Sequence, residues 1–397
     1  MVNRGMVKLE RALACGIAAL TMAAASAAWA KGPERLVVHE WGTFTSIAGD
    51  DGVALEWRPL TGPSDLPGFV YTLENQVVGL RNTPVSKSMM EGTVRMETPV
   101  IYFYADAPMD VSLKVRFPKG QITEWYPRAE VVDEGGVDWG RFRIIPDQEP
   151  AFLTEPAPSH YYPARATDAA PLRVCSTRGD EFEKFLFYRG VGTFDLPLKV
   201  TLGGDGALSL RQPRGGQIGR VVIFERRGDR VGFFAADLDG DAARIVRPAL
   251  DKKLDDVLAA LTRQLIDEGL YEKEARAMVD TWRDHWFEEG LRVLTMLPRS
   301  ATDALLPLTM SPAPTELVRV LVGRVEVVTP ELVTLVRARL IQAIHSPEPR
   351  RARLLEALQR EHGRFLEPVV KRTLASIPEP AERAAIEAAI HALTPLE

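Results

Sequence analysis

His39 and Glu40 carry the most distinctive chemistry near the start of the chain, within the sequence VVHEWGTFTS at 37–46. β-Branched and aromatic residues dominate this stretch, which predicts a β-strand. Adjacent side chains of a strand point to opposite faces, so whichever face packs inward buries a titratable group. That group then needs a partner or a shifted pKa. Two interpretations are open. The buried group is either structural, as a core histidine or a glutamate paired with arginine, or it is a catalytic residue.

Acid/base or metal-assisted hydrolysis is one reaction class that these residue types could support. Four side chains are candidates for it: His39, Glu40, Glu124 and His160. Arg165 is the candidate for positioning an anionic group of the substrate. A metal site requires three or four ligands, for which His39, His160 and Asp168 are candidates. No compact HxH or HExxH spacing occurs, so the sequence predicts no metal and no other cofactor.

Four tryptophans directly follow an acidic residue: Glu40-Trp41, Glu56-Trp57, Glu124-Trp125 and Asp138-Trp139. Acids near aromatic platforms are typical of carbohydrate binding and glycoside cleavage. Neighbours on a strand face opposite sides, so the alternative is a Trp that packs inward beside an acid that faces solvent. Five side chains are candidates for ligand binding: Trp41, Trp125, Tyr161, Tyr162 and Arg165.

Segments distributed over most of the chain resemble a family of uncharacterised secreted bacterial proteins that open with a VHEWGTFTS motif. The motif occupies residues 38–46 here. The other similar segments are METPVIYFY at 96–104, EWYP at 124–127, HYYPAR at 160–165, FLFYRG at 185–190 and WFEEG at 286–290. The resemblance implies a secreted protein that shares the fold of this family. It assigns no activity and no catalytic residue.

Residues 1–30 have the form of a secretory signal peptide. A basic region precedes an Ala-rich apolar run, and Ala28-Trp29-Ala30 matches a cleavage site. The apolar run is too short to span a membrane, so we expect export to the periplasm or the exterior and no membrane span. Without these residues the chain has 46 basic and 53 acidic side chains, a net charge of −7, which argues against nucleic-acid binding.

Cys175 is the only cysteine that remains after cleavage at this site, so no intrachain disulfide is expected. Burial protects a lone thiol in an oxidising compartment, and free Cys is among the most buried residue types. We therefore predict an inert core residue. A nucleophile that works with His160 is the alternative.

Residues 36–236 have the pattern of a β-sandwich built from short antiparallel strands. Residues 109–117 alternate apolar and polar side chains, as a half-buried strand does. Two proline-rich loops interrupt the pattern, at 57–99 and 146–171. Loops of this length are usually functional or disordered. The bulky rings in the second loop argue against disorder and predict that it lies ordered across the sandwich.

Helical periodicity prevails after about residue 242. We expect a mainly α-helical domain at 242–397, with possible strands at 292–297 and 317–327. Thr329-Pro330-Glu331 predicts a helix start, since it combines a capping hydroxyl, a first-turn proline and an acid near the positive end of the helix dipole. The predicted fold class is α+β, in which an antiparallel β-sandwich-like domain at 31–241 precedes this helical domain.

No phosphate-binding glycine loop, G-x-S-x-G elbow or dinucleotide fingerprint occurs in the sequence. We expect a non-enzymatic envelope or extracellular binding protein whose ligand is a carbohydrate or a protein. The alternative is the hydrolase described above. Convergence of His39, Glu40 and His160 in one cleft favours the hydrolase. An ion pair between His39 or Glu40 and a buried arginine favours the binding protein.

Overall fold

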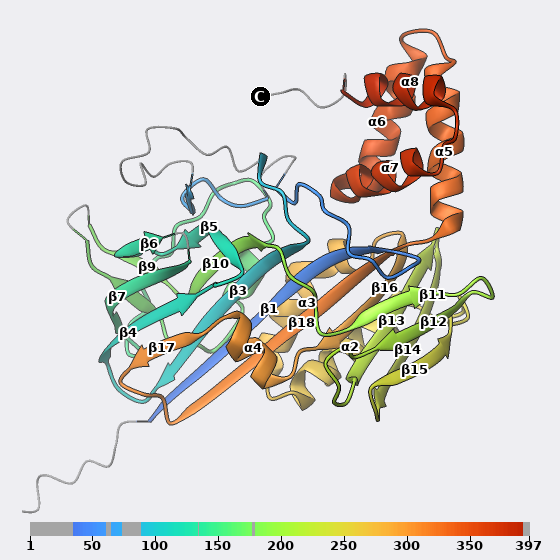
Figure 1. The fold of residues 1–397 in the computed structure, drawn as a ribbon. Coiled ribbons are helices and arrows are strands. Elements are labelled where there is room, and N and C mark those ends of the chain that lie inside the picture. The colour runs from blue at the N-terminus through green and yellow to red at the C-terminus, as the bar shows by residue number, and fades with distance from the viewer. Residues whose placement is uncertain (1–34, 61–64, 74–88, 134, 177–178, 392–397) are drawn as a thin grey trace, which may run out of the picture.

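The computed structural model describes residues 35–60, 65–73, 89–133, 135–176 and 179–391 (Figure 1). The predicted signal peptide and part of the loop predicted at 57–99 lie outside these residues. The described chain mixes strands and helices. Strands prevail in its N-terminal part, and helices are concentrated in its C-terminal part.

The stretch around His39 forms the central strand of a nine-stranded sheet. This strand, β1 (Leu36–Gly49), pairs antiparallel with β3 (Val94–Ala105) and parallel with β18 (Glu316–Val328). The other strands are β2 (Tyr71–Thr72), β5 (Gly120–Tyr126), β10 (Phe185–Gly192), β13 (Gly219–Arg227), β14 (Arg230–Leu238) and β16 (Gly290–Met296). Their order is β14-β13-β16-β18-β1-β3-β10-β5-β2.

Two smaller sheets pack against one face of the nine-stranded sheet. One consists of β17 (Leu308–Ser311), β4 (Met109–Arg116), β7 (Gly136–Ile144), β8 (Leu172–Val174), β9 (Glu181–Glu183) and β6 (Val131–Asp133). The other consists of β11 (Lys199–Leu202), β12 (Ala207–Arg211) and β15 (Ala242–Val246). Apolar side chains of all three sheets, among them Phe44, Leu113, Leu208 and Val293, form one core.

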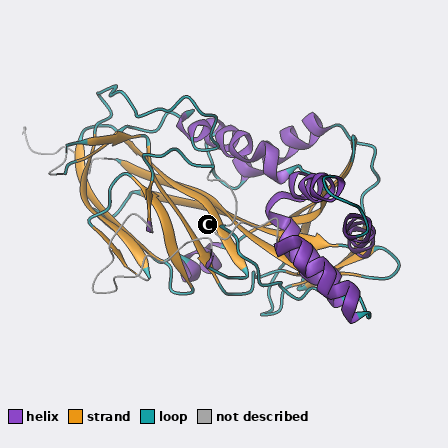
Figure 2. Ribbon diagram, turned by 90° about the horizontal axis from the view of Figure 1, so that it is seen from above, coloured by secondary structure: helices purple, strands orange, loops and turns teal. Residues whose placement is uncertain are grey.

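Two helices cover the opposite face of the nine-stranded sheet: α2 (Leu254–Asp267) and α3 (Glu272–Trp286) (Figures 1 and 2). Leu261 of α2 and Trp282 of α3 share a second core with Trp41 and Tyr102 of the sheet. Because both faces are covered, β1 is buried along its whole length. None of the described helices is long and apolar enough to cross a membrane.

Four helices form a bundle at one end of the sheet (Figure 1): α5 (Pro330–Ile344), α6 (Arg350–His362), α7 (Leu366–Ala375) and α8 (Pro380–His391). A shorter helix, α4 (Arg299–Leu305), follows β16. The predicted start of α5 is confirmed, because the Thr329 hydroxyl accepts a hydrogen bond from the Leu332 backbone N–H at 3.2 Å. Ile47 and Trp57, from β1 and the segment after it, pack into the core of the bundle.

The strands predicted at 292–297 and 317–327 correspond to β16 and β18, which both lie inside the nine-stranded sheet. Residues on both sides of the predicted boundary at 241/242 therefore share one sheet. The helical bundle begins only after β18. The sheet also departs from the predicted antiparallel pattern, because β1 and β18 are parallel neighbours (Figure 1, blue and orange).

Cys175 is exposed, so the prediction of a buried thiol is wrong. The alternation of β8 gives the reason: Leu172 and Val174 are buried, and Cys175 continues the outward row of Arg173. We expect the Cys175 thiol to react with a disulfide reagent in the native protein. The rate should rise with pH as the thiolate forms, and it should do so at a higher pH than for a free cysteine, since burial and the neighbouring Asp180 raise the pKa of Cys175. A thiol that reacts only after unfolding would contradict this account.

A small cavity of about 20 Å³ lies where the bundle meets the sheet, and His362 at the end of α6 lines it. The imidazole is buried, and its Nε2 has no hydrogen-bond partner in the described part of the chain. Burial lowers the pKa of His362 below its ordinary value, although the Glu361 carboxylate opposes this effect. The folded chain therefore holds this histidine neutral at a pH where an exposed histidine is protonated.

We expect the bundle to lose stability as the pH falls below about 6.5, the ordinary pKa of histidine. The unfolded chain then binds a proton that the folded chain excludes from His362, which favours unfolding. Hydrogen exchange in α5–α8 at about pH 7.5 and about pH 5.5 measures the effect. His362→Gln should remove this pH dependence. His345→Gln, at an exposed histidine of the same bundle, should leave it unchanged; equal pH dependence in both variants would contradict the assignment.

Candidate functional site

Glu40 points into the core between the sheets and is fully buried. Its carboxylate accepts hydrogen bonds from the Tyr188 hydroxyl at 2.5 Å and from the guanidinium of Arg319 on β18. Arg319 also donates to Asp303 at 2.8 Å. Burial lowers the pKa of Arg319, but the attraction of Glu40 outweighs it and the pKa lies above its ordinary value. Glu40 therefore has an arginine partner, as in the structural alternative, and no route to a substrate.

His39 points to the opposite face and is also fully buried. Its Nδ1 lies 2.8 Å from a carboxylate oxygen of Glu274, in the first turn of α3. The same carboxylate accepts hydrogen bonds from the Tyr104 hydroxyl and from the Tyr271 backbone N–H, each at 2.8 Å. The ring of Tyr271 packs 4.4 Å from that of His39. Glu274 thus ties the start of α3 to the strands β1 and β3.

A cavity of about 660 Å³ borders this cluster, which consists of His39, Tyr104, Tyr271 and Glu274. The cluster contributes Tyr104 and Tyr271 to the cavity wall, while His39 and Glu274 lie behind them. Its other lining residues are the residue before β1, the last residue of β3 and the one after it, residues of the 146–171 loop, and the residue before β10. They are Arg35, Ala105, Asp106, Pro146, Gln148, Glu149, Pro150, Phe152, Thr167, Asp168, Ala169, Ala170, Pro171 and Lys184.

The 146–171 loop is held in place by Arg165, which ends a short 3₁₀ helix (Tyr162–Arg165). Arg165 pairs with the buried Glu183 at 2.7 Å and donates to the Leu153 carbonyl oxygen at 2.8 Å. Its guanidinium also lies 5.3 Å from the centre of the Phe152 ring. One side chain therefore links both halves of the loop to β9, and this fixes the outer wall of the cavity.

Trp41, Trp125 and Tyr161 are fully buried, so the prediction that they contact a ligand is wrong. The Tyr161 hydroxyl donates a hydrogen bond to Glu183 at 2.9 Å, which attaches the 146–171 loop to β9. The acids of Glu40-Trp41 and Glu124-Trp125 do not face solvent as the alternative predicts, because both members of each pair are buried; Glu56, beside the buried Trp57, does. The physical reason is the same for these two buried pairs. The sheet is covered on both faces, so no side of these strands faces solvent.

Tyr162 and Arg165 are only partly buried, but their contacts are internal to the loop. The Tyr162 hydroxyl accepts a hydrogen bond from the Glu155 backbone N–H at 2.8 Å, and the guanidinium of Arg165 lies 5.1 Å from the centre of the Tyr162 ring. These two predicted binding residues therefore shape the cavity wall, and neither lines the cavity itself.

Glu124 and His160 belong to a second polar group, on the helix-covered side of the sheet. Arg189 on β10 pairs in register with Glu124 and donates from both Nη atoms to Asp65 at 2.9 Å. Burial raises the pKa of Asp65, but Arg189 and Arg95 outweigh it and hold the pKa well below its usual range. His160 lies 4.0 Å from Asp65 and stacks on Trp282.

Irregular backbone coincides with this second group. Three strand pairs shift register near Arg189 and the neighbouring part of β1 and β3. They are β1 with β3, β3 with β10, and β10 with β5. Thr98 has φ 46, the only positive φ of a non-glycine residue in the described chain. Bulges and strained backbone re-aim side chains and are frequent beside functional sites. This group, with Asp65, Glu124, His160 and Arg189, is therefore the second candidate site.

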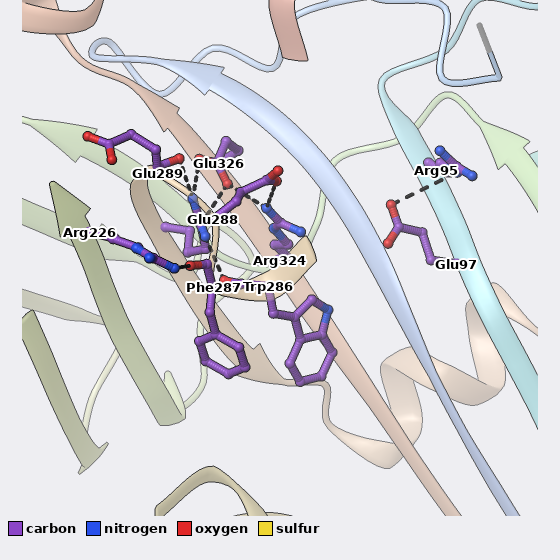
Figure 3. Close-up of polar contacts among 10 residues, drawn as sticks. Arg95, Glu97, Arg226, Trp286, Phe287, Glu288, Glu289, Arg324 and Glu326 are labelled. Carbon is purple, nitrogen blue, oxygen red and sulfur yellow. Dashed lines mark hydrogen bonds and ion pairs between the residues drawn. The ribbon is translucent and has the colours of Figure 1, made fainter. Parts of the chain in front are cut away.

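Further buried charged side chains lie beyond the second polar group, on β18 and β16 (Figure 3). Arg324 donates to Glu288 at 3.0 Å and to Glu326 at 2.9 Å, and Arg292 donates to Glu326 at 2.9 Å. Figure 3 shows Arg95 and Glu97 on the far side of β1 from Arg324. Each buried charge of the Arg324 group has an opposite partner, as burial requires. The Arg324 group therefore links β16 to β18.

The four hydrolase candidates do not meet in one site. Glu40 faces away from His39, across the sheet. His39 contacts Glu274, and His160 contacts Trp282, eight residues further along α3, which corresponds to about 12 Å at about 1.5 Å per residue. Asp168, a metal candidate with His39 and His160, pairs with Lys273 at 2.5 Å on the surface. Within the described ranges, no three His, Cys, Asp or Glu side chains are placed to hold a metal ion.

Of the side chains that line the cavity, sequence reasoning singled out only Asp168, as a metal candidate. Tyr104 carried a weak signal, because it lies in the METPVIYFY segment. Tyr271 and Lys184 carried none, since their place in the wall depends on how α3 and β10 pack against β1 and β3. No local pattern encodes contacts between segments so far apart.

No family model and no curated protein matches the sequence. Among solved structures, the chain is similar to the Fcho1 Mu homology domain of Danio rerio with bound Eps15 peptide. The sequence identity is 6%, and the TM-score is 0.26. The match covers 74% of this chain and 94% of that one. A likeness this weak carries no functional argument.

Proposed function

We propose that the protein is an exported, non-enzymatic binding protein that takes a small ligand into the cavity beside Tyr104 and Tyr271. The cavity, about 660 Å³, is the observation that carries the proposal. This volume falls in the range of about 300–1,000 Å³ that is typical of small-molecule sites. Export rests on the basic and apolar start of the sequence.

The rigidity of the cavity wall supports binding. Glu274 fixes Tyr104 and the backbone of Tyr271, and Arg165 fixes the 146–171 loop. A wall whose side chains are already held in place loses little conformational entropy when a ligand enters. The sandwich-like layering of the sheets gives this wall a stable support. The burial of His39, Glu40 and Glu124 removes three of the four candidate catalytic groups from contact with any substrate.

Hydrolysis at the second polar group is the other candidate function. The register shifts and the strained Thr98 favour it. It retains the partly exposed His160 as the acid/base candidate, 4.0 Å from Asp65, and Arg189 joins Asp65 to the buried Glu124. Turnover of any compound in the panel described next, lost in His160→Gln, would establish this reaction in place of simple binding.

A panel of small molecules tests the binding proposal: neutral oligosaccharides, amino acids, short peptides and organic anions. Hydrogen exchange of the purified protein, with and without each class of compound, measures how much the backbone amides are protected. We expect one class to protect the segments 146–152 and 167–171, with little change in α5–α8. Protection at neither segment by any class would contradict the proposal.

A further inference from the structure

We propose that the ligand of this cavity is a neutral, hydroxyl-rich molecule, and specifically the end of an oligosaccharide. This inference rests on the proposed binding function and adds the chemical class of the ligand. Three features of the wall carry it: the balance of its charges, the way its aromatic rings are presented, and the prolines of the loop.

The charges that line the cavity nearly cancel. Arg35 and Lys184 line it together with Asp106 and Glu149. The remaining acid, Asp168, is already paired with Lys273 outside the cavity. A site for a strongly charged ligand carries an excess of opposite charge, which raises both affinity and association rate. A balanced set of donors and acceptors instead suits a ligand with many hydroxyl groups and no net charge.

Three aromatic residues line the cavity: Tyr104, Tyr271 and Phe152. Tyr104 directs its hydroxyl to Glu274, away from a ligand, so its contribution to the wall is the ring. Tyr271 is 40% exposed, and its ring lies 4.9 Å from that of Tyr104. Phe152 completes the set from the loop. Sugar rings have apolar C–H faces beside polar hydroxyls, and such a ligand matches aromatic surface next to polar side chains.

The prolines disfavour a peptide that binds by strand addition. Pro146, Pro150 and Pro171 line the cavity and lack backbone N–H donors. The main-chain hydrogen bonds of strand addition need a continuous row of donors and acceptors along an exposed edge. This part of the loop offers no such row, so recognition depends on side chains, as it does for sugars.

Calorimetric titration with chitotriose, cellotriose and maltotriose tests the inference on the purified protein. We expect at least one trisaccharide to bind, and Tyr271→Ala to weaken it about tenfold, because the exposed ring is lost. Tyr271→Phe keeps the ring and should recover most of the affinity that Tyr271→Ala loses. Phe152→Ala is a second cavity variant, in case Tyr271→Ala folds poorly. Leu335→Ala, at an exposed residue of α5, is the matched surface control.

The outcomes separate this inference from the binding proposal. Binding of amino acids, anions or peptides in the cavity, with none of the sugars, would overturn the sugar assignment and leave the binding function intact. Sugar binding that neither Tyr271→Ala nor Phe152→Ala weakens would also overturn it, because the sugar would then bind elsewhere. No binding by any class would contradict both.

Discussion

Replacing Arg319 by methionine is expected to destabilise the protein by about 3–5 kcal/mol, because the substitution leaves the buried Glu40 carboxylate without its cation. The side chains of Glu40 and Arg319 are 0% and 1% exposed, so water cannot replace the lost partner. Urea unfolding of parent and variant measures the loss. The double variant Glu40→Gln/Arg319→Met should recover most of it, since the neutral amide no longer requires a cation and still accepts from Tyr188.

Arg299→Met is the matched control for this experiment. Arg299 pairs with the same Asp303 that Arg319 contacts, but its side chain is 46% exposed. An exposed pair of this kind contributes about 0–1 kcal/mol. If Arg319→Met costs no more than Arg299→Met, the buried ion pair at Glu40 does not anchor β1 to β18, and the account of the opening stretch is wrong.

Glu274→Ala is the second substitution with a large expected effect. It removes the acceptor for Tyr104, for the Tyr271 backbone and for His39, and each buried group left unsatisfied costs about 1–3 kcal/mol. We expect a loss of stability of about 3–5 kcal/mol and a loss of ligand binding, because the start of α3 and the cavity wall are released together. Urea unfolding measures the loss of stability, and calorimetric titration with the trisaccharides measures the loss of binding.

Tyr104→Phe serves as the graded control. It removes one of the three contacts and keeps the ring in the cavity, so it should cost about 0.5–1.5 kcal/mol and preserve sugar binding. A Glu274→Ala variant as stable as Tyr104→Phe would show that the carboxylate does not organise this wall.

The sequence predicts the local structure of several elements well. The capping pattern before α5 and the alternation in β4 are local signals, because they depend on neighbouring residues alone. The partners of His39 and Glu40 have no such signal. Glu274 and Arg319 lie 235 and 279 residues away from them, and their contacts arise from the packing of α3 on the sheet and the parallel pairing of β1 with β18.

The candidate site shows the same limit. Proline and aromatic content singled out the 146–171 loop as ordered, and that loop forms most of the cavity wall. The prediction that Trp41 and Trp125 bind a ligand requires that one face of each strand is exposed to solvent. Covering the sheet with helices on one side and two further sheets on the other buries both rings. The rings that line the cavity, Tyr104 and Tyr271, come together only in the folded chain.

A crystal structure of the protein with the tightest-binding trisaccharide tests the central claim most directly. We predict sugar density in the cavity, with a ring against Tyr271 and polar contacts to side chains such as Arg35, Gln148 or Lys184. Density outside this cavity, for example beside Asp65 and His160 at the second polar group, would contradict the assignment of the binding site.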